Sequence, residues 1–304
     1  MHRLIEHFLD SLGQERDFSP NTVAAYRNDL VQFSGYLHQQ FGQDDWLALT
    51  DDYLRSYDLH LRERQYAKST VARKIAAIKS FCNYLIDQYG LTINPTTSLS
   101  PPRVDKFAPQ AITQDEVRAL LAAVDRQVGP AGLRDQAMLR VLYSTGMRVS
   151  ELTALDLDDY EVGGVVRCGR KPDRQRAVPL SREAIEAVEQ YLGVGREMLT
   201  QRSDEAALFV NQRGSRLTRQ GFWLILKSYA EASNLPDITP HTLRHTFAAH
   251  AVGSGTELHE VQHILGHVSI STTQVYQRLA EKVGAGRASF VASASACYDS
   301  DASE

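Results

Sequence analysis

The sequence contains few cysteines. The 304 residues include three, Cys82, Cys168 and Cys297. An odd number of widely spaced cysteines is not the disulfide framework of a small secreted domain. Long apolar runs are absent as well, because no stretch approaches the roughly 18 apolar residues of a membrane span. The opening MHRLIEHFLD carries acidic residues and no apolar signal-peptide core. We therefore expect a reduced cytoplasmic protein that has no contact with a membrane.

Positive charge is not in excess. Lys and Arg number 33 against 37 Asp and Glu, a net charge of −4, which excludes an indiscriminate polycationic binder. The basic residues instead gather in 62–79, 167–176 and 211–220. One such stretch alone is typical of a solvated face, but three in an acidic protein favour a polyanionic partner. The candidate contacts from these stretches are Lys68, Ser69, Arg73, Lys74, Arg216 and Arg219.

Helical periodicity dominates the chain. In the first hundred residues Ser19 with Pro20 predicts one helix start, and Ser69 predicts a second, with Gly90 as its stop. The second helix has an inward stripe, while Arg73 and Lys74 lie largely off it. The stripe consists of Val71, Ile75, Ile78, Cys82 and Leu85.

The region after residue 98 changes in composition. Residues 99–110 are rich in Pro and Ser and lack a helical period, which indicates a linker. Thr113 with Glu116 then forms a capping-box pattern, and 162–181 predicts a β-hairpin with charges at its tip. The expected organisation is a helical N-terminal domain (1–98), the linker, a second domain (111–285) and a flexible or partner-docking tail (286–304). The predicted fold class is mainly α, with a small antiparallel sheet or hairpin in the second domain.

Four segments concentrate the side chains that phosphoryl transfer requires: GMRVSEL, CGRKPDRQR, HTLRHTFAAH and LGHVSISTTQVYQRL. Paired arginines match the oxygens of a phosphate, histidines move protons near neutral pH, and a lysine can protonate a leaving oxygen. A tyrosine can attack phosphorus and form a covalent ester. Because cationic side chains supply the charge stabilisation that a metal otherwise gives, we expect neither a metal nor a cofactor.

The order of these motifs resembles that of the tyrosine recombinase (lambda-integrase-like) family. With the helical FSPNTVAAYRNDL region in front, the chain looks like the Xer-type members, and the resemblance covers all but the tail. It implies an N-terminal SAM-like core-binding domain and a site-specific recombinase that works on double-stranded DNA with paired half-sites. Cleavage and rejoining would pass through a 3′-phosphotyrosyl intermediate and a Holliday junction, in a homo- or hetero-tetramer associated with the nucleoid.

The resemblance also implies roles for individual residues. Tyr276 would be the nucleophile, and Arg148 with Arg244 would clamp the scissile phosphate. His241 would assist proton transfer at the tyrosine, and His267 would donate a hydrogen bond to the phosphate. Lys171 would be the general acid, although Arg170 and Arg174 are close enough to compete for that role. Glu151, three residues after Arg148, would orient its guanidinium.

For Xer-type members the resemblance implies resolution of chromosome or plasmid dimers, under the control of a DNA translocase. Two alternatives to this function stay open. One is an integrase or transposase of a mobile element with the same chemistry. The remote alternative is a zinc metalloprotease, because His259, Glu260 and His263 form a literal H-E-x-x-H. If Thr256 caps that helix, the inward face consists of Leu258, Val261, Ile264 and Leu265. The three polar residues then face outward, which tells against a metal site.

Overall fold

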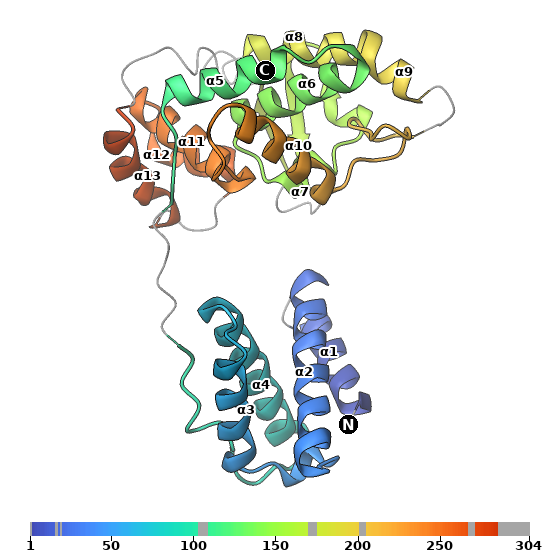
Figure 1. The fold of residues 1–304 in the computed structure, drawn as a ribbon, viewed down its shortest axis with the longest axis vertical. Helices are drawn as coiled ribbons and strands as arrows, with labels where there is room; N and C mark the ends of the chain where they lie inside the picture. The colour runs from blue at the N-terminus through green and yellow to red at the C-terminus, as the bar shows by residue number, and fades with distance from the viewer. Residues whose placement is uncertain are drawn as a thin grey trace, which may run out of the picture. The chain divides into compact units, whose positions relative to one another are not determined.

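The chain divides into two compact units, Met1–Phe107 and Ala108–Glu304, and both are mostly helical (Figure 1). The computed structural model describes residues 2–15, 18, 20–102, 109–169, 175–200, 205–266 and 271–284. The division falls within 99–110, the segment whose composition indicates a linker. Within the described residues, no helix combines the length and the apolar character that a membrane span needs. The predicted fold class, mainly α with one small antiparallel sheet, is confirmed.

The first unit is a bundle of four helices around an aromatic core. Its elements are α1 (His2–Glu15), α2 (Pro20–Phe41), the 3-10 turn η1 (Trp46–Ala48), α3 (Asp51–Glu63) and α4 (Lys68–Tyr89). Helix α1 packs on α2 and α4, and α2 packs on α3 and α4. Trp46 is the centre of the core, since its ring lies 5.8 Å from that of Phe33 and 5.0 Å from that of Phe81. Such aromatic contacts add to the burial of large apolar surfaces.

The ends of the helices follow the sequence signals in part. Pro20 is the first residue of α2, and Gly90 ends α4 in the left-handed conformation with φ of 73°. Ser69 does not cap α4, because that helix begins one residue earlier at Lys68 with Ala67 at its cap. The predicted stripe of α4 is buried throughout: Val71, Ile75, Ile78, Cys82 and Leu85.

The structure corrects the placement of Lys74. Its side chain is buried, and its ammonium group donates to Asp29 Oδ1 at 2.8 Å and lies 5.4 Å from the centre of the Tyr66 ring. Arg73 also pairs with the buried Asp29 while keeping part of its side chain exposed. Lys74 therefore neutralises a carboxylate inside the unit, because α2 packs against the flank of α4 that periodicity alone left open.

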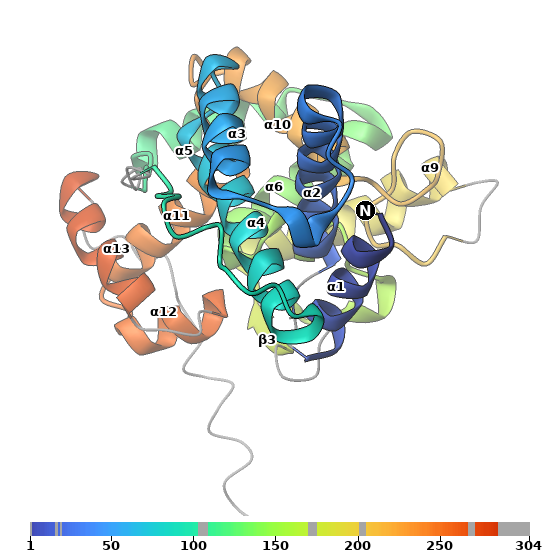
Figure 2. The same ribbon diagram turned by 90° about the horizontal axis from the view of Figure 1, so that it is seen from below.

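The second unit surrounds helix α6 (Gly129–Thr145), which contacts α5, α7, α8 and α11. The other elements are α5 (Gln114–Asp125), α7 (Val149–Leu152), η2 (Leu157–Asp159), α8 (Arg182–Gln190), the π-helical η4 (Tyr191–Arg196), α9 (Glu197–Thr200), α10 (Arg219–Ala232), α11 (Pro240–Gly253), α12 (Leu258–Leu265) and α13 (Ser271–Lys282). Helices α12 and α13 pack on α11 at one end of this unit, and α9 lies at the opposite end (Figures 1 and 2).

A three-stranded antiparallel sheet contains the predicted hairpin. Strands β1 (Tyr160–Glu161), β2 (Val165–Cys168) and β3 (Arg176–Pro179) lie in the order β1-β2-β3, with Cys168 opposite Arg176. The hairpin is thus confirmed, and its tip at 170–174 lies outside the described residues. Its alternating burial brings Arg176 and Val178 inward.

Two helix starts in this unit test the capping signals. Thr113 and Glu116 form the predicted capping box at the start of α5, with each side chain bonded to the other's backbone N–H. The expectation for Thr256 is wrong, since α12 begins at Leu258 with Glu257 at its cap. The cap of α12 thus lies one residue later than predicted, a difference that is common at helix ends.

We predict that Asp29→Ala lowers the free energy of unfolding by about 3–5 kcal/mol, because it leaves the Lys74 ammonium buried without its carboxylate. The double variant Asp29→Leu, Lys74→Met should recover most of this loss. Urea unfolding followed by Trp46 fluorescence measures both. Glu6→Ala is the matched control, because its partner Arg27 is exposed and surface pairs contribute at most about 1 kcal/mol. Equal losses for Asp29→Ala and Glu6→Ala would contradict the structural role of the buried pair.

Candidate active site

The segment after α6 places Arg148 and Glu151 together. Arg148 is the cap of the short helix α7, and its backbone N–H donates to Glu151 Oε2 at 2.7 Å. The Arg148 guanidinium is partly exposed, and its Nη1 lies 3.5 Å from Glu151 Oε1, at the limit of a hydrogen bond. Glu151 therefore holds the backbone at Arg148 more firmly than it holds the guanidinium, which stays available to solvent or to a ligand.

The stronger partner of Glu151 is Arg176, a residue that the sequence analysis missed. Its two terminal nitrogens donate to the carboxylate at 3.0 and 3.1 Å, and its Nε donates to the carbonyl of Ile264 at 2.6 Å. Burial disfavours the ionised Glu151, but the bonds from Arg176 and from the Arg148 N–H outweigh it, so the pKa of Glu151 is lowered. This paired geometry is the fork that arginine forms with carboxylates. In the sequence, the alternation of strand β3, which places Arg176 on the buried face, was the signal that could have identified this residue.

Gly146 allows Arg244 to reach the same region. This glycine ends α6 with φ of 58°, and a Cβ on it would lie 2.3 Å from a ring carbon of Phe247. A side chain is therefore excluded at Gly146. Arg244 on α11 donates from Nη1 to the Gly146 carbonyl at 2.6 Å and from Nη2 to the Leu265 carbonyl at 2.7 Å. The carbonyls at the end of α12 are thus bonded by two buried arginines, Arg176 and Arg244.

The electrostatics of Arg244 favour an anion. Its side chain is only 4% exposed, and the acceptors found for it in the described part of the chain are neutral carbonyls. Burial first, and the Arg148 guanidinium second, lower the pKa of Arg244 to about 10. A buried cation whose charge is not matched by a bonded carboxylate is stabilised by a bound anion. The partly exposed guanidinium of Arg148 is close enough to Arg244 to add to the positive charge of this region.

Helix α11 also brings two histidines to this site. His241 lies in its first turn, after the Thr239 cap, and is exposed. Because Arg244 and His245 follow His241 by three and four residues, all three lie on one face of the helix. His245 was not among the predicted site residues, although this spacing marks it.

Tyr276 faces His245 from helix α13. The tyrosine is 2% exposed, and its hydroxyl lies 3.0 Å from His245 Nδ1. Burial raises the pKa of Tyr276, and Arg244 and Arg148 oppose that shift, which places the hydroxyl within the field of both arginines. The structure therefore brings together Arg148, Glu151, His241, Arg244 and Tyr276 of the predicted set, and adds Arg176 and His245.

Two predicted site residues, Lys171 and His267, lie outside the described residues. Gly266, directly before His267, ends α12 with φ of 62°. A Cβ at that position would lie 3.1 Å from Arg176 Nη1, so the close approach of Arg176 favours glycine there. The turn at Gly266 therefore packs directly against the Arg176 guanidinium.

The H-E-x-x-H segment has the surroundings of a solvated surface. His259 and His263 are exposed on α12, and His259 Nδ1 lies 3.0 Å from the carboxylate of Glu257. Val261, Ile264 and Leu265 are buried on the opposite side, as predicted, whereas Leu258 and Glu260 are partly buried. Within the described ranges, no group of three or more His, Cys, Asp or Glu is arranged to hold a metal ion.

The candidate nucleic-acid contacts separate by exposure. Lys68 and Ser69 are exposed at the start of α4, Arg73 keeps part of its side chain exposed, and Arg219 is exposed at the start of α10. On the same helix as Arg219, the ammonium group of Lys227 lies 5.3 Å from the centre of the half-exposed Trp223 ring. These positions remain accessible to a ligand, whereas Lys74 does not.

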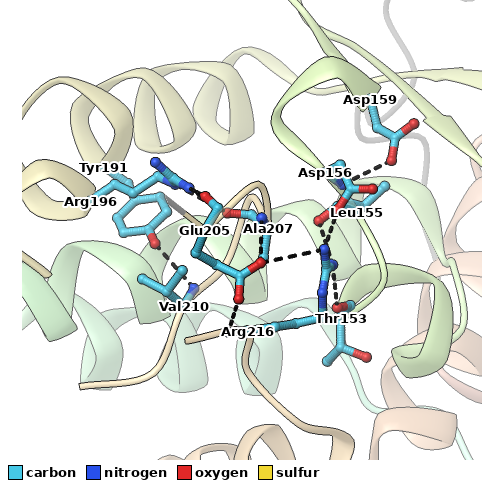
Figure 3. Close-up of polar contacts among 10 residues, drawn as sticks. All are labelled: Thr153, Leu155, Asp156, Asp159, Tyr191, Arg196, Glu205, Ala207, Val210 and Arg216. Carbon is cyan, nitrogen blue, oxygen red and sulfur yellow. Dashed lines mark hydrogen bonds and ion pairs between the residues drawn. The ribbon is translucent and has the colours of Figure 1, made fainter. Parts of the chain in front are cut away.

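Arg216 has a structural role that its place in a basic stretch did not indicate. Its Nη1 donates to the carbonyls of Thr153 and Leu155 at 3.2 and 3.0 Å, and Nη2 pairs with Asp156 (Figure 3). Its own N–H donates to Glu205 at 3.0 Å. This side chain ties the segment before α10 to the loop after α7, and its contact with a polyanion stays a prediction.

Comparison with known proteins gives two family matches. Residues 110–282 match the phage integrase family, and residues 5–89 match the N-terminal SAM-like domain of phage integrases. Among curated relatives, tyrosine recombinase XerC of Herpetosiphon aurantiacus is 50% identical over 91% of this chain and 90% of its own length. Tyrosine recombinase XerD of Halalkalibacterium halodurans is 41% identical over 90% and 91%.

Solved structures have the same fold. XerH site-specific recombinase bound to its difH substrate, in a pre-cleavage complex, matches with a TM-score of 0.71 at 20% identity, over 93% of both chains. A lambda integrase dimer bound to a COC' core site matches with a TM-score of 0.68 at 16% identity, over 91% of this chain and 95% of the other. At these identities the likeness extends to the fold alone.

We predict that Glu151→Gln lowers the free energy of unfolding at pH 7 by about 3 kcal/mol, because Arg176 then stays buried beside a neutral amide. Since the pKa of Glu151 is lowered on folding, its contribution is present above the unfolded pKa near 4.5 and is lost as the pH falls through the folded value. The gap between parent and variant should therefore narrow below pH 4.5.

Denaturant unfolding at pH 7 and at pH 4 measures this gap. Glu161→Gln is the matched control, because the ion pair of Glu161 with Arg167 is exposed on the neighbouring strands and should contribute less than about 1 kcal/mol. A gap that stays constant over this pH range would contradict an ionised, bonded Glu151.

Proposed function

Because this chain belongs to the phage integrase family, the tyrosine recombinases that cleave and rejoin DNA, we propose that it resolves chromosome or plasmid dimers as a site-specific recombinase. The observation that carries the proposal is the buried Arg244. Its guanidinium is held by two carbonyls, and it influences the pKa of the neighbouring Tyr276. A nucleophile beside two cations is the arrangement that attack on a phosphodiester requires.

In the proposed reaction, the Tyr276 hydroxyl oxygen bonds to phosphorus and the bond from phosphorus to the 5′-oxygen breaks. The tyrosine proton passes to His241, and Lys171 supplies a proton to the departing 5′-oxygen. Arg148 and Arg244 stabilise the five-coordinate transition state, and His267 donates to a phosphate oxygen. The 3′-phosphotyrosyl ester retains the energy of the broken bond, so a 5′-hydroxyl of a partner strand can reverse the step without ATP.

Glu151 and Arg176 support this chemistry without touching the substrate. Glu151 holds the backbone at Arg148, and Arg176 joins that carboxylate to the end of α12. We assign no metal or cofactor to the reaction, since the charge on the transition state is met by the arginines. This assignment is tested by activity in the presence of a chelator.

The proposed DNA partner is a duplex with paired half-sites, contacted by both units. Lys68, Ser69, Arg73 and Arg219 are the proposed phosphate or base contacts, because they are the exposed members of the basic stretches. We propose that the first hundred residues act as a DNA-binding domain, that 111–285 form the catalytic domain and that 286–304 dock on a neighbouring protomer. The working assembly would be a homo- or hetero-tetramer in the cytoplasm, on a Holliday junction and under the control of a DNA translocase.

The other sequence-based candidate, an integrase of a mobile element, uses the same chemistry. The curated relatives favour dimer resolution, because those at 50% and 46% identity carry the name XerC and those near 40% carry the name XerD. The two candidates differ in the DNA that is recombined and not in the site.

We predict that the protein forms a covalent adduct with nicked suicide duplexes in EDTA, and that Tyr276→Phe abolishes it, because the phenylalanine ring has no oxygen to attack phosphorus. Substrate sites are first selected by binding from a random duplex library. Denaturing gels then detect the protein attached to the strand. Tyr160→Phe, which removes a hydroxyl on strand β1, is the control and should form the adduct as the parent does. A parent that forms no adduct on any selected site would falsify the proposed function.

We predict that Lys171→Ala slows cleavage by about 100-fold or more, the range of a positioned general acid. A 5′-phosphorothiolate linkage should restore the rate, because a thiolate leaves without protonation. Single-turnover cleavage of both linkages measures the rescue. Arg170→Ala and Arg174→Ala are the matched controls from the same hairpin tip. Rescue of either one, in place of Lys171→Ala, would move the general-acid role to that arginine.

A further inference from the structure

The contact between Tyr276 and His245 has no role in the reaction described so far. The hydroxyl oxygen lies 3.0 Å from His245 Nδ1, and the two ring centres are 5.6 Å apart. Tyr276 is almost fully buried, and His245 is partly buried. A buried hydroxyl that loses its partner bears the full desolvation penalty. Loss of the hydrogen bond between Tyr276 and His245 would therefore cost free energy.

The direction of this hydrogen bond follows from the chemistry of the two groups. A phenol is a stronger donor than acceptor, and a neutral imidazole accepts on the nitrogen that carries no proton. The hydroxyl of Tyr276 therefore donates to Nδ1, and the imidazole proton lies on Nε2. Burial first, and then His241 and Arg244, lower the pKa of His245 to about 4, so the ring is neutral near pH 7.

His245 is poorly suited to remove the tyrosine proton. The pKa of Tyr276 is raised above its usual value of 10 by burial, while that of His245 is lowered to about 4. Proton transfer between them is thus strongly uphill. General bases work best when their pKa lies near the operating pH. His245, which contacts the nucleophile, consequently acts as a hydrogen-bond acceptor and not as its base.

We propose that His245 is a positioning residue that holds the Tyr276 hydroxyl while the DNA is not cleaved. This hydrogen bond thereby favours rejoined DNA over the covalent intermediate. The proposal rests on the proposed function, since it assumes that Tyr276 becomes a phosphate ester. The ester oxygen carries no proton, so the hydrogen bond to Nδ1 exists only while the tyrosine is free. An interaction present on one side of an equilibrium shifts that equilibrium toward its own side.

The test measures the covalent fraction at equilibrium on an intact duplex. His245→Phe keeps a planar ring and removes the acceptor, so the ratio of covalent to uncleaved DNA should rise about three- to tenfold, the usual net worth of one hydrogen bond. His245→Asn places an amide oxygen near the position of Nδ1 and should return the ratio toward that of the parent. His263→Phe, on the exposed face of α12, should leave the ratio unchanged.

Rates separate this role from general-base catalysis. A base assists cleavage and rejoining through the same transition state, so its loss slows both by about 100-fold or more and leaves the covalent fraction where it was. A covalent fraction in His245→Phe equal to that of the parent overturns the proposal, whatever the rates are. A raised fraction that His245→Asn reverses supports it.

A second measurement needs no DNA. Unfolding of the free protein is compared for the parent, His245→Phe, Tyr276→Phe and the double variant. The hydrogen bond predicts that the double variant is less destabilised than the sum of the single variants, by about a three- to tenfold factor in the unfolding equilibrium constant. Additive effects overturn the proposal. If the parent forms no adduct on any DNA, the proposed function and the effect on rejoining fail together, while this cycle still decides whether His245 holds the hydroxyl.

Discussion

The buried pair of Glu151 and Arg176 is the interaction on which the site depends. Its two hydrogen bonds join α7 to β3, and the third nitrogen of Arg176 reaches the end of α12. Three segments far apart in the sequence are thereby fixed next to Arg148. A buried ion pair adds little to stability compared with apolar packing, yet breaking it leaves a charge that the interior cannot solvate. The pair of Glu151 and Arg176 therefore matters because it fixes the positions of α7, β3 and the end of α12 relative to one another.

Around that pair, the site concentrates positive charge where the fold supplies few counter-charges. Arg244 is buried against two carbonyls, and its pKa is lowered by burial and by Arg148. The protein thus holds two cations close together, the arrangement from which phosphate binding is proposed. The first unit uses the opposite solution, because its buried Lys74 is neutralised by Asp29. The contrast separates Lys74, whose charge is neutralised inside the fold, from Arg244, for which we propose an anionic ligand.

Sequence order alone was sufficient to predict much of the architecture. Two helices of the first unit (α2 and α4), the capping box at Thr113, the hairpin and the mainly helical class follow from periodicity, caps and turns, which are local properties. The resemblance of the motifs to those of tyrosine recombinases also implied that Arg148, His241, Arg244 and Tyr276 would converge. Their spacing on a helix, three residues between His241 and Arg244, is a local signal.

Tertiary structure alone decided which charged and polar side chains are used inside the protein. Lys74 and Arg216 read as contacts for a polyanion, yet one neutralises Asp29 and the other ties the segment before α10 to carbonyls after α7. Arg176 and His245 were overlooked, yet they hold Glu151 and Tyr276. The physical reason is that helix period and strand alternation show which face is buried, but a hydrogen bond between residues tens of positions apart depends on how those faces meet.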